Sequence, residues 1–396
     1  MTFSEFKKAE HIRPLMLPDK EKYYLDLQNI ERSWSGRMDL LSLGNTFILE
    51  AEQLLINAIE LFEMGYFDCA YYSLRTAVDV STTIVFLADM PQEEREVQLS
   101  KWKGPDNFPM QRQMIEKLFQ NGDAFVDMKN KMPAFFENAK TLSAELNKYV
   151  HKQGFQHFYV SRNHFLNLHK SPDNFISCFA DYFKKCTGVV AVMRLALDPF
   201  PVLLMDKDIL YRCYDSLTEP YSEEFVAEYI GQESLDSYKK TARYVGMYEY
   251  LMSLEEKNEY VFDVVKNQYI DSHQKEAILS QAHLMTKWDI VSSLLVFACE
   301  KVTKVYIENG LDQYFTDRKS NRQSWAYSSQ DFLNFAKAPT PLNQAYGKAF
   351  ISVFRFQNEV YSLEHNTPLT DNDVACVENA FIEAEIYLEQ ALSDNS

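Results

Sequence analysis

Glycine and proline are the residues that most readily interrupt a helix, and this chain has few of either. Its 396 residues include 11 Gly and 13 Pro, while Leu, Ala, Glu, Lys and Met are abundant. This composition favours long helices over many short strands. The length also leaves room for two hydrophobic cores. We therefore expect an all-α protein made of two helical-bundle domains.

A proline-rich interruption marks the predicted boundary between these domains. Residues 198–201 read Asp-Pro-Phe-Pro and end a helix that the pattern predicts over residues 171–197. The first domain is then residues 1–200, a helical bundle with an N-terminal arm. The second domain is a helical bundle of residues 206–396.

A faint symmetry relates the two halves. Glu145 and His151 are separated by five residues, as are Glu359 and His365. Each pair ends a predicted helix, and a loop and a capped terminal helix follow it. The second domain is accordingly a candidate divergent duplicate of the first.

Apolar periodicity places the individual helices. A stripe at helical spacing runs through residues 47–62, Gly65 interrupts it, and a second stripe follows through residues 70–85. This pattern predicts a tight helical hairpin, and a polar loop is expected over residues 312–329. Further helices are predicted at residues 111–120, 133–151, 171–197, 223–230, 234–253, 275–308, 341–363 and from 370 onward.

Charge and cysteine usage restrict the class of protein. The formal net charge of −17 disfavours a general nucleic-acid coat protein, and we expect no DNA partner. The six cysteines are scattered with no C-x-x-C pair, which is typical of free thiols in a reducing compartment. No signal peptide or membrane-spanning run is visible at the sequence level. We expect a cytoplasmic protein without a membrane partner.

Polar residues suited to chemistry gather in one stretch, Arg162-Asn163-His164-Phe165-Leu166-Asn167-Leu168-His169. Arg162 and His169 are seven residues apart, a spacing that returns to nearly the same face of a helix. An imidazole that moves a proton would then project beside a guanidinium that holds an oxyanion. Surface or helix-capping roles are the alternative. The neighbouring histidines match no common zinc spacing, so we expect no metal and no cofactor.

Two family resemblances involve the predicted hairpin. Residues 58–79 resemble a tetratricopeptide repeat, but no second copy follows at the 34-residue period that such repeats need. Residues 46–197 resemble the HEPN superfamily of helical bundles found in prokaryotic toxin and antiviral systems. There a hairpin of the type Gly-Tyr-x-x-Ala-Tyr-Tyr-x-Leu-Arg precedes an Arg-x4-6-His motif and a last helix, and residues 65–79 resemble this hairpin with one more residue before Ala70. Arg162-Asn163-x5-His169 fits this motif.

The HEPN resemblance implies a function and a set of site residues. Catalytic members cleave RNA without a metal, with the histidine as general base toward a ribose 2′-hydroxyl and the arginine neutralising the phosphate. Arg162, Asn163 and His169 would form the site. His151 competes with His169, because residues 146–151 also resemble a histidine segment of HEPN-like proteins that lack the arginine. Sites of this family are commonly shared between two chains, which implies a homodimer.

An alternative function of another class remains. The acidic charge and the absence of the motif from the second half favour a non-catalytic helical scaffold that binds another protein. The leading expectation is an HEPN-like protein of a prokaryotic defence or toxin–antitoxin type, acting on RNA as a ribonuclease.

Overall fold

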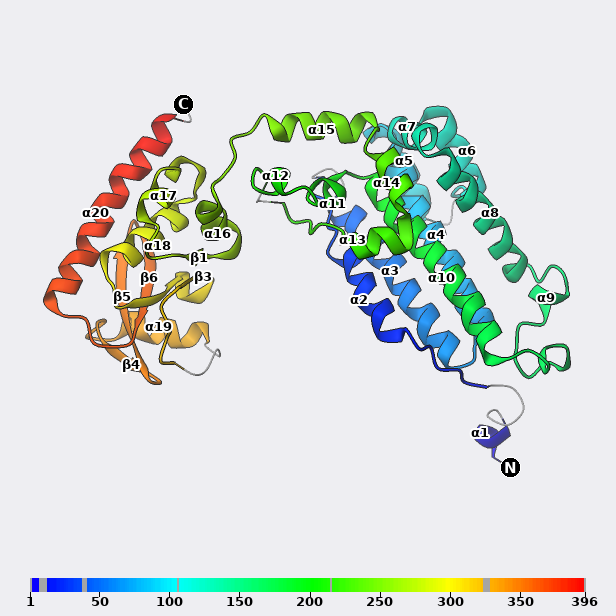
Figure 1. Cartoon of the computed structure of the whole chain (residues 1–396), viewed down its shortest axis with the longest axis horizontal. Coiled ribbons are helices and arrows are strands. Elements are labelled where there is room, and N and C mark those ends of the chain that lie inside the picture. Colours follow the sequence, from blue (N-terminus) through cyan, green and yellow to red (C-terminus); the bar gives the residue numbers. More distant parts are fainter. Residues whose placement is uncertain are drawn as a thin grey trace. The chain divides into compact units, whose positions relative to one another are not determined.

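The chain divides into two compact units, Met1–Ser253 and Leu254–Ser396 (Figure 1). The computed structural model describes residues 2–6, 13–37, 41–104, 107–213, 216–322 and 328–394. Within these residues no helix combines the length and the apolar character that crossing a bilayer requires.

The first unit is helical. Its elements are α1 (Phe3–Phe6), α2 (Lys20–Glu31), α3 (Leu41–Glu63), α4 (Phe67–Ala88), α5 (Gln92–Lys103), α6 (Gln111–Asn121), α7 (Asp123–Lys131), α8 (Pro133–Val150), α9 (Phe155–Phe158), η2 (Phe165–Asn167), α10 (Pro172–Leu195), α11 (Phe200–Leu203), α12 (Lys207–Leu210), α13 (Glu223–Phe225), η3 (Val226–Ile230), α14 (Gln232–Tyr238) and α15 (Ala242–Met252).

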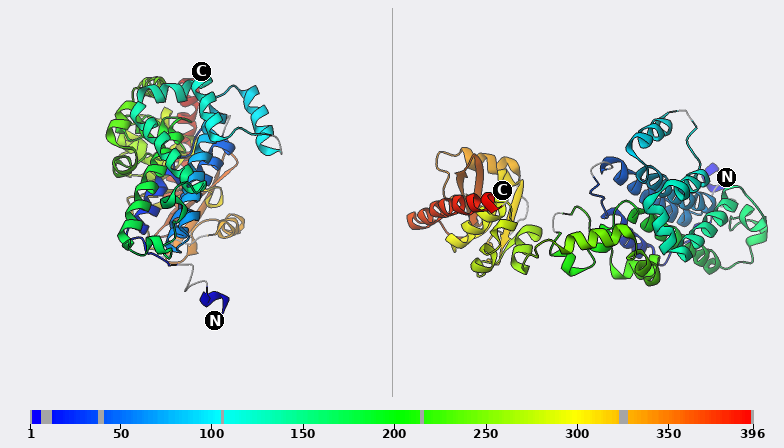
Figure 2. Two further views of the ribbon diagram at one scale, coloured as in Figure 1. Left: turned by 90° about the vertical axis from the view of Figure 1, so that its right-hand side faces the viewer. Right: turned by 90° about the horizontal axis from the view of Figure 1, so that it is seen from above.

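Helix α4 is the centre of this bundle, in contact with α3, α8 and α10 (Figures 1 and 2). The predicted hairpin is confirmed as α3 and α4, and Gly65 between them adopts a φ of 87°, which favours glycine. Phe62 of α3 stacks on Phe179 of α10 with ring centroids 4.2 Å apart. This aromatic packing fixes the end of α10 at which the candidate site lies.

The boundary between the units falls at residue 253 and not at residues 198–206. Arg194 is fully buried and pairs with Asp198 at 3.1 Å, so the chain at the proline-rich interruption is fixed inside the first core. The following residues return to the same helix, since Tyr221 and Tyr238 donate hydrogen bonds to carbonyls of α10. Prolines here end a helix without ending a domain.

The second unit contains a sheet, so the prediction of an all-α protein is wrong. Its elements are α16 (Glu259–Asn267), β1 (Tyr269–Ile270), α17 (Lys275–Leu279), η4 (Ala282–Leu284), α18 (Lys287–Ala298), β2 (Val302–Ile307), η5 (Glu308–Gly310), β3 (Asp312–Thr316), α19 (Ser329–Lys337), β4 (Gln344–Tyr346), β5 (Ala349–Phe356), β6 (Glu359–His365) and α20 (Asp371–Asp394). The protein is an α/β protein with a largely helical chain.

The six strands lie in the order β1-β3-β2-β6-β5-β4, with β1 parallel to β3 and the other pairs antiparallel. On one face of the sheet, α18 and α20 contact each other and form the larger hydrophobic core with the strands. Helix α19 covers a smaller core around Phe332 on the other face. A sheet buried on both faces needs apolar residues at consecutive positions, which removes the alternation typical of a half-exposed strand.

Two predicted helices of the second half are replaced wholly or in part by this sheet. Residues 275–308 form α17, η4, α18 and β2, and residues 341–363 fall on β4, β5 and β6. The predicted loop at residues 312–329 includes β3, while its residues 323–327 lie outside the described residues.

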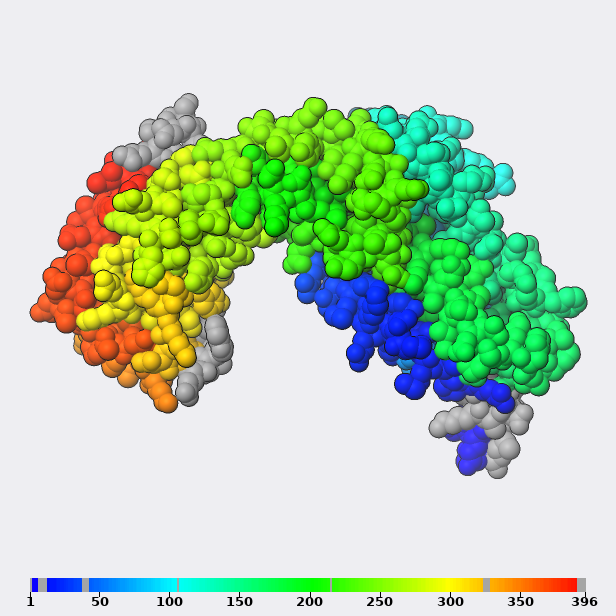
Figure 3. Space-filling model, viewed as in Figure 1, coloured from blue at the N-terminus to red at the C-terminus, as the bar shows by residue number. Residues whose placement is uncertain are grey.

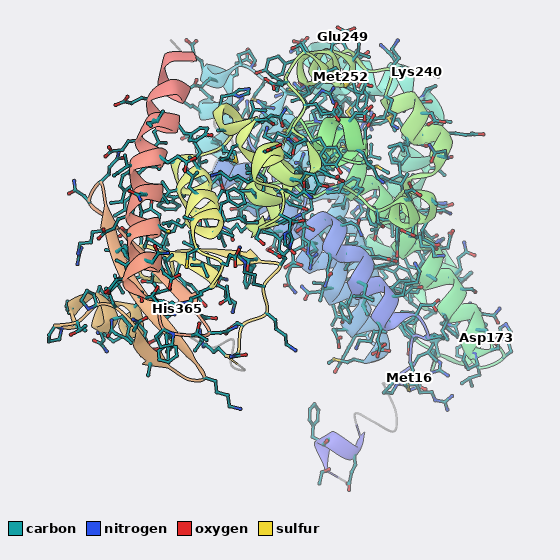
Figure 4. All side chains as sticks on the ribbon, turned by 60° about the vertical axis from the view of Figure 1, so that its left-hand side comes forward. Met16, Asp173, Lys240, Glu249, Met252 and His365 are labelled. Carbon is teal, nitrogen blue, oxygen red and sulfur yellow. The ribbon has the colours of Figure 1, made fainter. Side chains whose placement is uncertain are left out.

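The two Glu-x5-His segments differ in structure, which removes the basis for a duplication. His151 caps the C-terminus of α8 and is exposed. His365 ends β6 and is fully buried, with its ring nitrogens 2.9 Å from the Ser352 hydroxyl and 2.8 Å from the Thr367 carbonyl (Figure 4). One histidine ends a helix at the surface and the other ends a strand in a core.

Candidate functional site

The segment between α8 and α10 carries the predicted site residues. After Val150 the chain makes turns, α9 and the 3₁₀ turn η2 before α10 starts at Pro172. Arg162 lies in the turn before η2 and His169 in the turn after it, so the two do not share a helix. The predicted geometry, a common helix face at seven-residue spacing, is therefore wrong. Figure 3 shows this blue-green segment at the surface of the first unit, beside the N-terminal arm in blue.

Asn167 holds this segment in shape. Its side-chain amide Nδ2 donates to the backbone carbonyls of Tyr159 and Ser161. The segment ends where Ser171 and Asn174 form a capping box on α10, whose N-terminal end is marked by Asp173 in Figure 4. The Asn167 side chain, which is 4% exposed, thus supplies hydrogen bonds to backbone carbonyls that would be bonded to backbone amides in a helix.

A cavity of about 340 Å³ opens under this segment, within the range of small-molecule sites. His169 lines it, together with Asn167 and Lys170 from the segment and Phe175 from α10. The remaining lining residues are Tyr71, Tyr149, Gln156, Tyr159, Val160, Asn174 and Cys178. Aromatic and amide side chains line this cavity, and none of the lining residues that the structure describes is acidic.

Two stacked tyrosines form part of the cavity wall. Tyr71 and Tyr149 have ring centroids 4.2 Å apart, and both hydroxyls reach the sulfur of Cys178, at 3.5 and 3.9 Å. Burial raises the pKa of Tyr71 well above its ordinary value, and burial also raises that of Tyr149. Both phenols therefore stay protonated at neutral pH, where they serve as hydrogen-bond donors and not as bases.

Arg162 lies near this cavity but is not one of its lining residues. Its guanidinium donates to the carbonyl of Pro14 at 3.0 Å and lies 5.9 Å from the ring centroid of Phe175, which lines the cavity. Burial, and secondarily the charge of Arg13, lower the pKa of Arg162. An arginine remains charged despite such a shift. His169 and Phe175 both line the cavity, and the permanent cation of Arg162 lies over the Phe175 ring.

The other two predicted residues take different positions. Asn163 lies next to Arg162, and its Nδ2 is buried without a hydrogen-bond partner among the described residues. An unsatisfied buried donor costs about 1–3 kcal/mol. Asn163 does not line the cavity. His151 is exposed at the end of α8 and does not line the cavity. The geometry favours His169 over His151.

Two more histidines of this segment pack against aromatic rings. His157 is buried, with Nδ1 3.0 Å from the Gln153 carbonyl, and its ring meets Tyr149 edge-on. His164 stacks on Tyr159 at 3.8 Å between centroids. In the part of the chain that the structure describes, no group of three or more His, Cys, Asp or Glu side chains is arranged to hold a metal.

The charge of the segment contrasts with that of the chain. Residues 146–172 contain no Asp or Glu, but contain Lys148, Lys152, Arg162 and Lys170 and four of the eight histidines. Lys152 forms an ion pair with Asp68, which offsets one of these charges. The acid-free stretch is still locally basic in a protein whose net charge is −17, and its Lys170 lines the cavity.

No family model, curated protein or solved structure matches this chain. The function therefore has to be argued from the site itself. Sequence reasoning missed Asn167, Cys178 and the tyrosines of the cavity. The sequence feature that could have pointed to Asn167 is its position as a polar residue between two apolar ones, Leu166 and Leu168.

Proposed function

We propose that the first unit is a metal-independent endoribonuclease whose reaction takes place at the cavity beside His169. One observation supports it above the others: His169 lines the cavity, and the Arg162 guanidinium lies over Phe175 of the same cavity. Both residues belong to the acid-free stretch of residues 146–172, which suits a polyanion.

The chemistry needs only protein side chains. The His169 imidazole accepts the proton of a ribose 2′-hydroxyl, and the 2′-oxygen forms a bond to the adjacent phosphorus. The bond from phosphorus to the 5′-oxygen breaks, that oxygen takes a proton from solvent, and a 2′,3′-cyclic phosphate remains. Arg162 stabilises the negative charge that develops on the phosphoryl oxygens. DNA has no 2′-hydroxyl and should stay intact.

The test compares single-residue variants of the full chain on RNA and on DNA of the same sequence. His169→Ala and Arg162→Ala should each lower the cleavage rate by roughly 10²–10⁴, because one removes the base and the other the cation. His151→Ala is the matched control, since it removes an exposed histidine of the same segment outside the cavity. EDTA should leave the rate unchanged.

Two outcomes contradict this proposal. Wild-type protein that leaves tRNA, mRNA and rRNA intact rules out the activity. Activity that survives both His169→Ala and Arg162→Ala, or that disappears in His151→Ala alone, rules out the assigned site. Circular dichroism of each variant verifies that lost activity does not reflect lost helicity.

A second candidate function, protein binding, is favoured by a separate observation. The same segment exposes large apolar side chains, with Phe155 78%, Phe165 71% and Leu168 58% exposed. Exposed apolar clusters of this kind mark contact surfaces. A second copy of the chain is the partner that we propose here, which would make the protein a homodimer. Light scattering at micromolar concentration should then give twice 46.3 kDa, and Phe165→Ser should restore the mass of one chain.

A further inference from the structure

Asn167 has one polar atom that the fold does not use. Its backbone nitrogen donates to the His164 carbonyl at 2.7 Å, and its own carbonyl accepts from Lys170 at 3.0 Å. The side-chain Nδ2 donates to two further carbonyls, those of Tyr159 and Ser161. Two carbonyl neighbours identify this atom as the nitrogen, because an oxygen would be repelled there. Among the described residues, nothing donates a hydrogen bond to the remaining atom, Oδ1.

This unused acceptor belongs to a cavity-lining residue. Asn167 is 4% exposed and lines the cavity of about 340 Å³. The side chain cannot rotate without releasing both carbonyls that Nδ2 holds, so the position of Oδ1 is fixed. A ligand that displaces water from this acceptor has to supply a donor in its place, or the hydrogen bond is lost.

The rest of the cavity is rich in aromatic side chains. Four of its lining side chains, Tyr71, Tyr149, Tyr159 and Phe175, are aromatic, and such rings suit stacking with a base. Lys170 lines the cavity as well, close in sequence to His169, so a phosphate attached to the ligand would find a cation.

We propose that the cavity holds a nucleobase and that Asn167 Oδ1 accepts a hydrogen bond from its exocyclic amine. Adenine and cytosine present such a donor on the Watson–Crick edge. Uracil presents one imide N–H between two carbonyl oxygens, which would face Oδ1 with like partial charge. The site therefore selects amino-bearing bases over uracil. This inference rests on the proposed ribonuclease function and adds to it the choice of base.

Binding of nucleotides that cannot be cleaved tests the choice of base apart from catalysis. The full chain is titrated with adenosine 3′-monophosphate and with purine riboside 3′-monophosphate, which has the same rings and phosphate but lacks the amine. We expect the adenine nucleotide to bind more tightly by on the order of 10-fold. The cytidine nucleotide should likewise bind more tightly than the uridine nucleotide. Equal affinity within either pair, or no binding of any of them, overturns the inference.

Variants identify the residue that reads the base. Asn167→Ala should abolish the adenine preference, because it removes the acceptor Oδ1 from the cavity. Gln156→Ala is the control, because Gln156 lines the cavity but is exposed. A preference that survives Asn167→Ala assigns Asn167 no direct part in recognition. If an Asn167 variant does not fold, the wild-type nucleotide pairs still decide the choice of base.

The outcomes separate this inference from the function on which it rests. RNA cleavage that requires His169 but shows no preference for amino-bearing bases leaves the ribonuclease standing and removes the role of Asn167. Selective binding of the adenine nucleotide by a protein that cleaves no RNA removes the ribonuclease and leaves a nucleotide-binding cavity.

Discussion

Glu52 provides the most direct test of the electrostatics of the first unit. It lies on α3, is 8% exposed, and belongs to the buried face of the bundle. Burial, and secondarily the negative charge of Glu31, raise the pKa of Glu52 to about 7. A carboxyl group with such a pKa is largely protonated in the folded protein under conditions where the unfolded chain has lost the proton. Replacing it by glutamine keeps the shape of the side chain and removes the titration.

The sign of the effect follows from proton binding. Below about pH 4.5, the ordinary pKa, both states are protonated and Glu52 contributes no pH dependence. Between about pH 4.5 and 7 the folded state binds more protons than the unfolded state, so the free energy of unfolding falls as the pH rises. The full shift of about 2.5 pKa units corresponds to about 3 kcal/mol at most. Above about pH 7 this penalty stays constant.

Calorimetry of the full chain from pH 5.5 to 8.5 measures this penalty. Glu52→Gln should be more stable than wild type at pH 8 by up to about 3 kcal/mol, roughly 6–12 °C in Tm for a unit of this size. The difference should shrink toward acid pH. Glu50→Gln is the control, because Glu50 is an exposed carboxylate on the same helix. A Tm difference between Glu52→Gln and wild type that does not change with pH refutes a buried, proton-retaining Glu52.

Two further substitutions test the packing of each unit. Gly188→Ala should destabilise the first unit by about 1–3 kcal/mol, because the added Cβ would lie 2.0 Å from the Tyr229 carbonyl oxygen. Gly246→Ala is the control, since its added Cβ meets no atom within 4 Å. Equal melting temperatures of the two variants would contradict the close approach of α10 and η3. Glu364→Gln should destabilise the second unit by about 3–5 kcal/mol in urea denaturation, because the fully buried Glu364 carboxylate lies 3.3 Å from Arg322 and 3.8 Å from Lys304. Glu383→Gln is the control, because Glu383 forms an exposed pair with Lys275, and it should lower the free energy of unfolding by about 1 kcal/mol or less. A similar loss of stability in both variants would show that burial of Glu364 does not strengthen its ion pairs.

The helical half could be predicted from sequence because its signals are local. Apolar residues recur with the helical period through α3 and α4, and Gly65 supplies the one left-handed residue at which the hairpin turns. The helices at residues 111–121, 133–150 and 172–195 begin and end within a few residues of the predicted positions. Long amphipathic helices contain their own pattern and need no distant partner to be recognised.

The sheet was missed because its turns and strands lack the usual signals. Strands β5 and β6 are joined by Gln357 and Asn358, both with positive φ, in a turn where Asn-Gly is the common pair. Asn309 and Gly310, which do carry that signal, connect β2 to β3 but follow a long apolar run and were interpreted as the end of a helix. Strands buried on both faces show no alternation, so a continuous apolar run resembles a buried helix.

Of the predicted site residues, the sequence places His169 in a cavity-lining segment but does not predict the geometry of that segment. Arg162 and His169 lie in turns that Asn167 holds and not along a helix, and Arg162 contacts the cavity-lining Phe175 without lining the cavity itself. Tyr71 and Cys178 come from α4 and α10, far apart in sequence, and only the packing of the bundle places them together. A sequence pattern within one segment does not predict contacts between elements that are distant in the sequence.

The order of the strands has a consequence for synthesis of the chain. Strand β2 pairs with β6 through contacts such as Ile307 with Tyr361, so the centre of the sheet closes only after β6 has been made. At roughly 5–20 residues per second, β2 waits about 3–12 s on the ribosome for this partner. During that interval one edge of the β2–β3 ribbon offers free amides and carbonyls to any extended chain nearby. The α3–α4 hairpin, joined by three residues, has no such delay, so nascent aggregation should begin in the second unit.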